Sequence, residues 1–428
     1  MSIAEREVVV AEHDLIGVGF GPSNLALAAA IDDGPNDLKA TFFERSSKFT
    51  WHGGLLLPGT TMQVPFLKDL ATPRTPRSRY TFLSYLQAHD RLHDFLNRGT
   101  FYPTRVEYHD YLSWAAEQLS SRVQYSAEVV GIRLMSPKIW RVEVVLDGQH
   151  QVHLSPNVVL ATGLVPRLPP GVTPSSRLWH SETLLPCIDE FDRQGSYTFA
   201  VVGGGQSAAE TAQYLHATYH SAQVHVYIDS FGFAPADESP FVNQIFDPKS
   251  VDLFFDLPDT AKQRVLRDHA NTNYGVVDRQ LINALYVTAY DETILGERRL
   301  QVHNMSRVIG AETGKDRVRL AIRDQRVGGI VHSSFDAAVF ATGYRHLDPT
   351  ALVSGSADLF AHGDDGRLIV ERSYRLRPKP PVSASLYLQG GTEDSHGLSS
   401  SLLSNIATRS EEILDRIASR AWSSARLG

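Results

Sequence analysis

Two glycine-rich turns of one type, each between a predicted strand and a predicted helix, constrain the fold of this chain most strongly. The first follows the apolar run DLIGV and carries Gly19 and Gly21; the second follows YTFAVV and carries Gly203 and Gly205. In such a turn the first glycine permits the tight bend and the second lets the backbone approach a pyrophosphate, which binds at the helix N-terminus. Each unit therefore predicts a dinucleotide site, and the alternative is a tight turn without a ligand.

The residues around these turns fit two different dinucleotides. Pro22 and Asn24 complete the first turn, although Asn24 is larger than the small residue usual at the third position. Glu44 ends the next predicted strand, where a carboxylate binds ribose hydroxyls; the alternative is an ordinary solvated glutamate. Two ATG segments follow later apolar strands, and we expect them where the chain crosses between two dinucleotide-binding domains; the alternative is an ordinary strand end. The second contains Thr342 and Gly343, for which we expect contacts with a cofactor. Because one chain rarely needs two nicotinamides, a flavin and a nicotinamide are the expected pair.

Length, charge and cysteine content exclude several classes of protein. A chain of 428 residues is too long for one core, so two or three domains are expected. The 48 acidic and 41 basic residues give a net charge of −7, which argues against nucleic acid as a partner. The single cysteine, Cys187, excludes an internal disulfide, a thiolate-rich metal site and the Cys-x-x-Cys pair of a dithiol reductase. No apolar run reaches the roughly 20 residues that cross a bilayer, so we expect a cytoplasmic protein.

Seven segments resemble, in order, the motifs of the flavin-dependent N-hydroxylating monooxygenases of siderophore biosynthesis, the L-ornithine/L-lysine N-monooxygenase family. The resemblance runs from about residue 14 to about residue 410 and therefore covers nearly the whole chain. The second and last segments are specific, whereas the glycine turns alone would fit any two-dinucleotide flavoprotein. The segments are DLIGVGFGPSNLALA, FTWHGGLLLPGTTMQVPFLKDLATPRTPRSRYTFLSYL, VVGGGQSAAE, SPFVNQIF, NTNYGVVD, FATGY and HGLSSSLLS.

Four residues match substrate-binding positions of that family. The resemblance implies that Lys68 binds the substrate carboxylate and that Asn243 contacts its amino acid end. It implies that Asn273 joins substrate and nicotinamide nucleotide, and that Ser399 lines the substrate and flavin pocket. Each has an alternative role. A lysine in an apolar segment commonly extends to water, asparagines form turns, and a serine run can cap a helix.

Five further residues match cofactor-binding positions. The resemblance places Gln63 beside the flavin ring and makes Trp51 and His52 flavin contacts, with plain core packing as the alternative for Trp51. It makes Gln206 and Ser207 contacts of the nicotinamide dinucleotide. No residue beyond the flavin is expected to be catalytic, and no metal is expected.

The resemblance also implies the reaction. NADPH would reduce FAD, O₂ would form a C4a-hydroperoxyflavin, and one oxygen atom would pass to N5 of L-ornithine. L-lysine N6-hydroxylation is the close alternative, since one methylene is worth only about 1–3 kcal/mol in a pocket. A diamine is less favoured because it lacks a carboxylate for Lys68.

The coenzyme is less clearly indicated than the flavin. The segment YIDSFGFAPADESPFVN contains no Lys or Arg, and its Asp229 favours an unphosphorylated ribose, so NADH is an alternative to NADPH. We also expect a homo-oligomer.

These observations predict an α/β fold with two Rossmann-like dinucleotide-binding domains, for FAD and NAD(P)H, and a smaller substrate-binding region. We expect helices within 80–120, short strands within 122–160, a less periodic region up to about 290, and an amphipathic helix near 404–420. The expected domains are an FAD-binding segment at 8–164, an NADPH-binding domain at 165–333 with substrate elements near 240–280, and a second FAD-binding segment at 334–428 with a pocket segment at 390–405.

Overall fold

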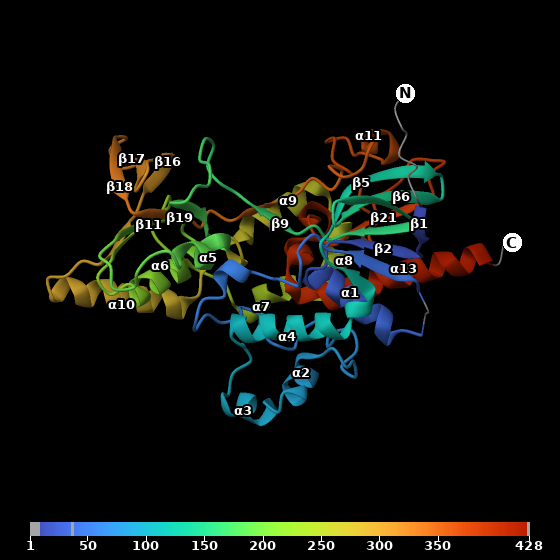
Figure 1. Cartoon of the computed structure of the whole chain (residues 1–428), viewed down its shortest axis with the longest axis horizontal. Helices are drawn as coiled ribbons and strands as arrows, with labels where there is room; N and C mark the ends of the chain where they lie inside the picture. Colours follow the sequence, from blue (N-terminus) through green and yellow to red (C-terminus); the bar gives the residue numbers. More distant parts are fainter. Residues whose placement is uncertain (1–8, 36–37, 426–428) are drawn as a thin grey trace.

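The computed structural model describes residues 9–35 and 38–425, so the expected domain start at residue 8 lies just outside the described residues. These residues form a pair of units that lie side by side, each built on a five-stranded parallel sheet (Figure 1). The first sheet has the order β21-β8-β2-β3-β4. Its strands are β2 (Leu15–Val18), β3 (Ala40–Phe43), β4 (Val123–Gln124), β8 (Asn157–Leu160) and β21 (Ser385–Leu388).

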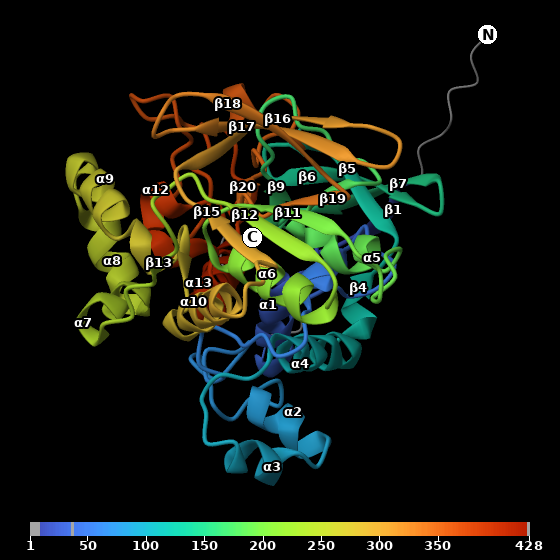
Figure 2. The same ribbon diagram turned by 90° about the vertical axis from the view of Figure 1, so that its left-hand side faces the viewer.

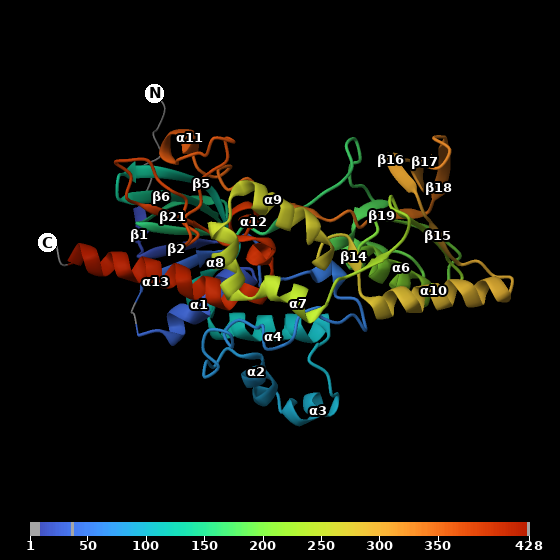
Figure 3. The ribbon, with the colours of Figure 1, turned by 180° about the vertical axis from the view of Figure 1, so that it is seen from behind.

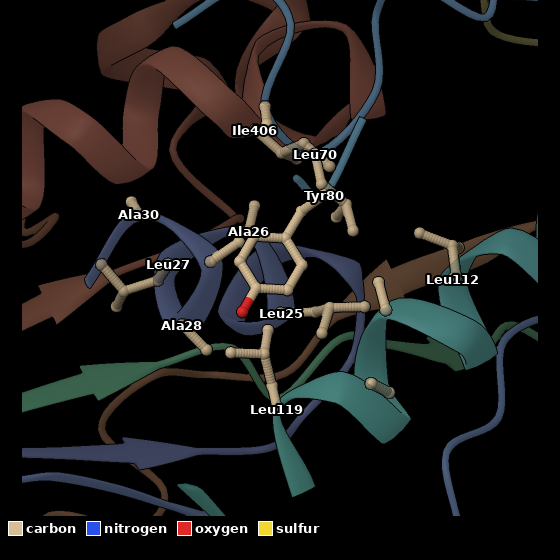
Figure 4. Packing of buried hydrophobic residues seen from close by; sticks show 14 of the residues in the cluster. Leu25, Ala26, Leu27, Ala28, Ala30, Leu70, Tyr80, Leu112, Leu119 and Ile406 are labelled. Carbon is tan, nitrogen blue, oxygen red and sulfur yellow. The ribbon is translucent and has the colours of Figure 1, made fainter. Parts of the chain in front are cut away.

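Helix α1 (Pro22–Asp33) connects β2 to β3 and is the core of the first unit. Its segment from Asn24 to Ile31 is buried throughout, because the alanines let other elements approach the helix closely. Figure 4 shows Leu25 of α1 among apolar side chains that include Tyr80 and Leu112. Helices α4 (Arg105–Gln118) and α13 (Ile406–Ala425) contact α1, while α2 (Phe82–Ala88) packs against α4 and α3 (Leu92–Asn97) packs against α2. All four lie where helices were expected.

The second unit repeats the plan of the first. Its sheet has the order β10-β19-β11-β12-β15, and α6 (Gln206–Thr218) connects β11 to β12. The strands are β10 (Leu178–His180), β11 (Thr198–Val202), β12 (Gln223–Tyr227), β15 (Leu300–His303) and β19 (Ala337–Phe340). Each unit also carries three antiparallel strands, which precede β8 in the first unit and β19 in the second. These are β5 (Ala127–Ser136), β6 (Ile139–Leu146) and β7 (Gln149–Ser155), extended by β1 (Val9–Glu12), and β16 (Ser306–Thr313), β17 (Val318–Asp324) and β18 (Ile330–Phe335).

The chain crosses between the two units twice, and the two crossing segments pair with each other. Strand β9 (Leu164–Pro166) leaves the first unit and runs antiparallel to β20 (Tyr344–His346), which returns to it. Because β19 is a central strand of the second sheet, the return begins a few residues later than the expected position 334. Each ATG segment lies directly before one of these crossings, as expected from the sequence.

A large insertion between β12 and β15 links the units a third time. This region was expected to be less periodic, but it is mostly helical, with α8 and α9 packed against α12 of the first unit (Figures 2 and 3). Its elements are β13 (Ala234–Pro235), α7 (Pro240–Asn243), η4 (Gln244–Phe246), α8 (Pro248–Asp256), α9 (Asp259–Asp268), η5 (Ala270–Thr272), β14 (Val276–Val277) and α10 (Arg279–Ile294).

The remaining elements are short. They are η1 (Gly53–Leu55), η2 (Ser120–Arg122), η3 (Ser181–Thr183), α5 (Leu184–Ile188), α11 (Ser356–Leu359), α12 (Glu393–His396), η6 (Leu398–Ser401) and η7 (Leu403–Asn405). Among the helices of the described residues, none combines the length and apolar character that a bilayer crossing requires.

Candidate active site

The first glycine turn has the geometry that a pyrophosphate cradle needs. Gly19 has φ of 82°, and a Cβ there would lie 2.5 Å from the carbonyl oxygen of Ala161 in the first ATG segment. Gly21 caps α1, and a Cβ there would meet no atom within 4 Å. Gly19 is thus required by the turn itself, whereas Gly21 leaves open space at the helix N-terminus, where Pro22 is the first helical residue.

Asn24 and Glu44 both hold this turn. The buried Asn24 amide donates to the Gly19 carbonyl at 2.7 Å, which explains why an asparagine replaces the usual small residue. The Glu44 carboxylate accepts from the backbone N–H of Phe20 and of Ser46, each at 2.8 Å. Glu44 therefore stands at the end of β3 beside the turn, the position at which a carboxylate meets a ribose.

The second glycine turn repeats this arrangement. Gly203 has φ of 146°, and a Cβ there would lie 2.3 Å from the carbonyl oxygen of Ala341 in the second ATG segment. A Cβ on Gly205 would have the Gly275 Cα as its nearest neighbour, at 3.5 Å. The segment NTNYGVVD therefore lies over the second turn, and half-buried Ser207 follows in the first turn of α6.

Thr342 and Gly343 hold the crossing between the units. The guanidinium of Arg167 donates to the Thr342 carbonyl at 3.1 Å, and the Arg167 backbone N–H donates to the Gly343 carbonyl at 3.0 Å. The His180 ring nitrogen lies 3.0 Å from the same Gly343 oxygen. These contacts give both residues a structural role at the crossing, and their expected cofactor contact stays a prediction.

Gln206 fixes the segment that covers the second turn. Its amide nitrogen donates to Glu210 at 2.8 Å, and its amide oxygen accepts from the Asp278 backbone N–H at 2.8 Å. Glu210 in turn accepts two bonds from Arg105 of the first unit, at 2.8 and 2.9 Å. The Arg105 and Glu210 side chains are only 13% and 3% exposed, so this is a buried ion pair between the two units.

Asn273 and Tyr274 extend from the second turn toward the first unit. Burial and the nearby Glu393 carboxylate raise the pKa of Tyr274 to about 12, and its hydroxyl bonds to the Asn273 side chain. The Glu393 carboxylate lies 2.8 Å from the His346 ring nitrogen and also accepts from Ser401. Burial opposes ionisation of Glu393, but these bonds hold its pKa below the usual value. Tyr274, next to the second turn, thus lies near the polar cluster of Glu393 and Ser401 in the expected pocket segment 390–405, and we call this place the polar junction.

Ser399 and the Asn243 region meet at the same side of the molecule. Ser399 is buried, and its hydroxyl lies 2.9 Å from the side-chain amide of Asn405, which also bonds the Phe246 carbonyl at 3.2 Å. The turn that follows Asn243 therefore touches the pocket segment. Asn243 itself is exposed and donates to the Glu238 carbonyl at 3.1 Å, the turn-forming role considered as its alternative. Its contact with substrate stays a prediction.

Lys68 lies half-buried in the loop after β3, and its position is set by its neighbour. Buried Asp69 accepts from the backbone N–H groups of Ala71 at 3.0 Å, of Thr72 at 2.6 Å and of Phe82 at 2.7 Å. Among the residues that the structure describes, no carboxylate or other polar group pairs with the Lys68 ammonium. A rigid loop thus presents a cation without a protein partner, which suits capture of an anionic ligand group.

Trp51, His52 and Gln63 flank this loop. The half-buried Trp51 ring packs against Tyr108 with centroids 5.9 Å apart, and it joins the core around α1. His52 adopts a left-handed conformation with φ of 53° at the start of η1, and Gln63 is exposed. Trp51 therefore fulfils the core role considered as its alternative, and flavin contacts by these three residues stay predictions.

Asp229 follows β12 and carries a partner that the local sequence does not reveal. The Arg307 guanidinium of β16 forms two bonds to its carboxylate, at 2.8 and 2.7 Å, and lowers the pKa of Asp229. Although the segment around Asp229 lacks Lys and Arg, the fold supplies an arginine from the neighbouring antiparallel sheet. Sequence reasoning missed Arg307, Arg105 and Glu210, because only the tertiary structure brings each beside its partner.

Two dinucleotide cradles on duplicated parallel-sheet units, joined by the Arg105–Glu210 ion pair, define this protein as a two-dinucleotide oxidoreductase. Comparison with known proteins narrows the class. The chain belongs to the L-lysine 6-monooxygenase/L-ornithine 5-monooxygenase family, whose model matches residues 11–346.

Individual relatives agree with this family. An ornithine N-hydroxylase from Kutzneria sp. 744, in a structure with reduced FAD, NADP⁺ and L-ornithine, is 43% identical with a TM-score of 0.93, over 96% of this chain and 100% of that chain. The L-ornithine N(5)-monooxygenase of Pseudomonas aeruginosa is 36% identical, with 94% of this chain and 92% of that protein aligned. The L-lysine 6-monooxygenase of Pseudomonas syringae is 30% identical with a TM-score of 0.82, over 95% of this chain and 99% of that chain.

Proposed function

We propose that this chain hydroxylates N5 of L-ornithine with FAD, NADPH and O₂, for a siderophore or related natural product. The observation that carries the proposal is the pair of glycine turns, at the starts of α1 and α6, on two units that the buried Arg105–Glu210 ion pair holds together. This ion pair joins α4 of the first unit to α6 of the second, and electron transfer between the two ligands requires that the units stay together. The similarity to ornithine hydroxylases along nearly the whole chain supports the same reaction.

Both cradles fit the proposed cofactors. Open space at Gly21 and the following helix N-terminus would receive the FAD pyrophosphate, while Glu44 would bind its ribose. The start of α6 after Gly205, beside the segment of Gly275 that lies over this turn, would receive NADPH. Bound and reduced FAD would supply the oxygen-transfer chemistry, and the chain would supply binding, orientation and exclusion of water.

The substrate nitrogen must be uncharged before it can accept an oxygen atom. A free alkylammonium has a pKa of about 10.4, so the site must favour the neutral amine. An amide such as that of Asn273 can accept from the amine without favouring the ammonium form, whereas a free carboxylate would favour it. Glu393, near the junction, is already engaged by His346 and Ser401. We therefore propose Asn273, and not an acid, as the group beside the reacting end.

The unpaired Lys68 ammonium would hold the opposite end of the substrate by its carboxylate. This favours an amino acid over a diamine, which offers no anionic group to Lys68. L-lysine remains the second candidate, since it carries the same carboxylate and one more methylene. The higher identity to the ornithine hydroxylases than to the lysine monooxygenase supports ornithine.

We propose NADPH as the preferred coenzyme, with NADH tolerated. A free Asp229 would repel a 2′-phosphate, but the Arg307 ion pair offsets its charge and brings a guanidinium to the same strand end. This pairing removes the objection that the local sequence raised against NADPH.

We further propose two dinucleotide domains that divide near residues 164 and 341, following the two sheets. We also propose a homo-oligomer, which the exposed apolar face of α10 supports. Its members are Tyr286, Val287, Tyr290 and Ile294. The cytoplasmic location stays a prediction from composition.

The test of the function is product analysis with ornithine, lysine, putrescine and cadaverine. Purified FAD-loaded protein would be supplied with NADPH and air, and hydroxylamine product would be compared with hydrogen peroxide released. The proposal expects most hydroxylated product, and least peroxide per NADPH, with ornithine. NADPH oxidation that yields only peroxide with all four amines would contradict it.

A further inference from the structure

A buried arginine lies behind the first glycine turn. Arg409 of α13 is only 2% exposed, and its guanidinium reaches three different elements. It donates to the Ser23 hydroxyl in α1 at 3.0 Å, to the Gln389 amide oxygen after β21 at 3.1 Å, and to the Ser400 carbonyl of η6. All three partners are neutral. Within the described residues, no carboxylate lies within ion-pair distance of this guanidinium.

The nearest acids are engaged elsewhere. Glu412 accepts two bonds from Arg372, at 2.7 and 3.0 Å, and Glu393 pairs with His346 at 2.8 Å. Arginine keeps its charge in proteins, and a buried charge without a counter-ion is costly. The Arg409 guanidinium is therefore a buried cation, and only hydrogen bonds to neutral groups compensate for its loss of hydration. Such a site favours an anion that arrives with a ligand.

The location identifies the class of that anion. Ser23 is the second residue of α1, whose first turn contains no acidic residue and whose cap, Gly21, faces open space. The Ser23 oxygen accepts from Arg409, so its own proton is free to be donated to a phosphate oxygen. The positive charge of the guanidinium and the positive end of the α1 dipole thus both favour binding of an anion at the turn.

We propose that Arg409 is the buried counter-charge of the dinucleotide pyrophosphate at the first glycine turn, and that it acts through Ser23. The proposal rests on the proposed FAD site and adds a positioning residue to it. The bond from Arg409 to the Ser400 carbonyl, next to Ser399, has a second consequence. The same guanidinium ties the pyrophosphate turn to the pocket segment, so dinucleotide binding stabilises both together.

The test compares apo-protein and FAD-loaded protein in two arginine variants. Arg409→Met removes the charge, and FAD affinity, measured by titration calorimetry, is expected to fall about tenfold or more. The melting temperature of the apo-protein is expected to stay equal or rise, because an uncompensated buried charge is removed. The rise in melting temperature on adding FAD is expected to shrink. Arg372→Met is the matched control, since Arg372 has a protein counter-ion, and it should lower apo stability while FAD affinity stays near wild type.

FAD affinity of Arg409→Met equal to that of wild type would overturn the proposal, whatever its melting temperature. If this variant does not fold, Arg409→Lys and Arg409→Gln replace it; weaker FAD binding by the Gln variant than by the Lys variant supports the role of charge, and equal binding overturns it. Inorganic pyrophosphate separates this proposal from the proposed function. Wild type that is stabilised by pyrophosphate but takes up no FAD would refute the FAD enzyme and retain the anion site.

Discussion

Breaking the ion pair between Arg105 and Glu210 should loosen the two units from each other. Replacing Arg105 by Met removes its two bonds to Glu210, of 2.8 and 2.9 Å, and one to the Leu55 carbonyl at 3.2 Å. Glu210, which is 3% exposed, keeps Gln206 as its remaining side-chain donor. Removing one partner of such a buried pair costs about 3–5 kcal/mol. At this chain length 1 kcal/mol corresponds to about 1 °C, so we expect the melting temperature to fall by about 3–5 °C.

Function should report the same change. Flavin reduction by NADPH, followed by stopped-flow absorbance, should slow, whereas reduction by dithionite should not, because dithionite needs no second unit. The double variant Arg105→Met with Glu210→Gln should recover most of the stability, since it removes the unpaired charge and keeps an acceptor for Gln206. Arg98→Met is the matched control, because the Arg98–Glu107 pair is more exposed and should contribute below about 1 kcal/mol. A single variant as stable as wild type, or a double variant no better than the single, would refute this reasoning.

Three other contacts lead to testable expectations. A Cβ at Gly54 would lie 1.8 Å from the Glu182 carbonyl oxygen, so Gly54→Ala should lower the free energy of unfolding by about 1–3 kcal/mol. The variant should also slow flavin reduction by NADPH but not by dithionite, and an unchanged NADPH rate would contradict the close approach of the units. Arg307→Ala should lower kcat/KM for NADPH and leave that for NADH nearly unchanged, whereas Asp229→Asn should raise the NADPH value. Steady-state kinetics with both coenzymes tests this, and an unchanged NADPH value in Arg307→Ala would show that Arg307 plays no part. Burial lowers the pKa of His396 to about 3, whereas the pKa of a histidine in the unfolded chain is about 6.5. Between these two pH values the unfolded chain binds more protons than the folded protein, so the free energy of unfolding falls as the pH falls. From pH 7 to pH 5 wild type should lose about 2 kcal/mol more than His396→Gln in denaturant titrations, and equal losses would show that His396 is not buried neutral.

Much of the fold could be predicted because its constraints are local. The glycine turns at Gly19 and Gly203 require positive φ between strand and helix, so the glycine spacing together with the flanking strand and helix patterns predicted both turns. The helical insertion from α8 to α10 was not expected. The exposed face of α10 carries apolar residues, so its sequence lacks the usual alternation of an apolar and a polar helix face. Which side of α10 is buried is decided by its packing against other elements.

The residues of the site divide in a similar way. Lys68 was identified by its motif. The structure shows that the neighbouring Asp69 fixes the loop of Lys68 by accepting backbone hydrogen bonds. Arg307 and Arg409 could not be identified, because each acts on a residue far away along the chain, Asp229 and Ser23 respectively. Asn243 was assigned to the substrate, yet its side chain bonds the Glu238 carbonyl, a contact that the sequence motif does not specify.

The proposed amino acid hydroxylation depends most on the ammonium of Lys68 meeting a substrate carboxylate. The decisive measurement is the ratio of kcat/KM for hydroxylation of ornithine and of putrescine, in wild type and in Lys68→Met. Wild type should strongly prefer ornithine. In the variant the ornithine KM should rise and the preference should collapse, while flavin reduction by NADPH stays normal. A preference that survives the substitution intact would contradict the assignment of Lys68 as the carboxylate site.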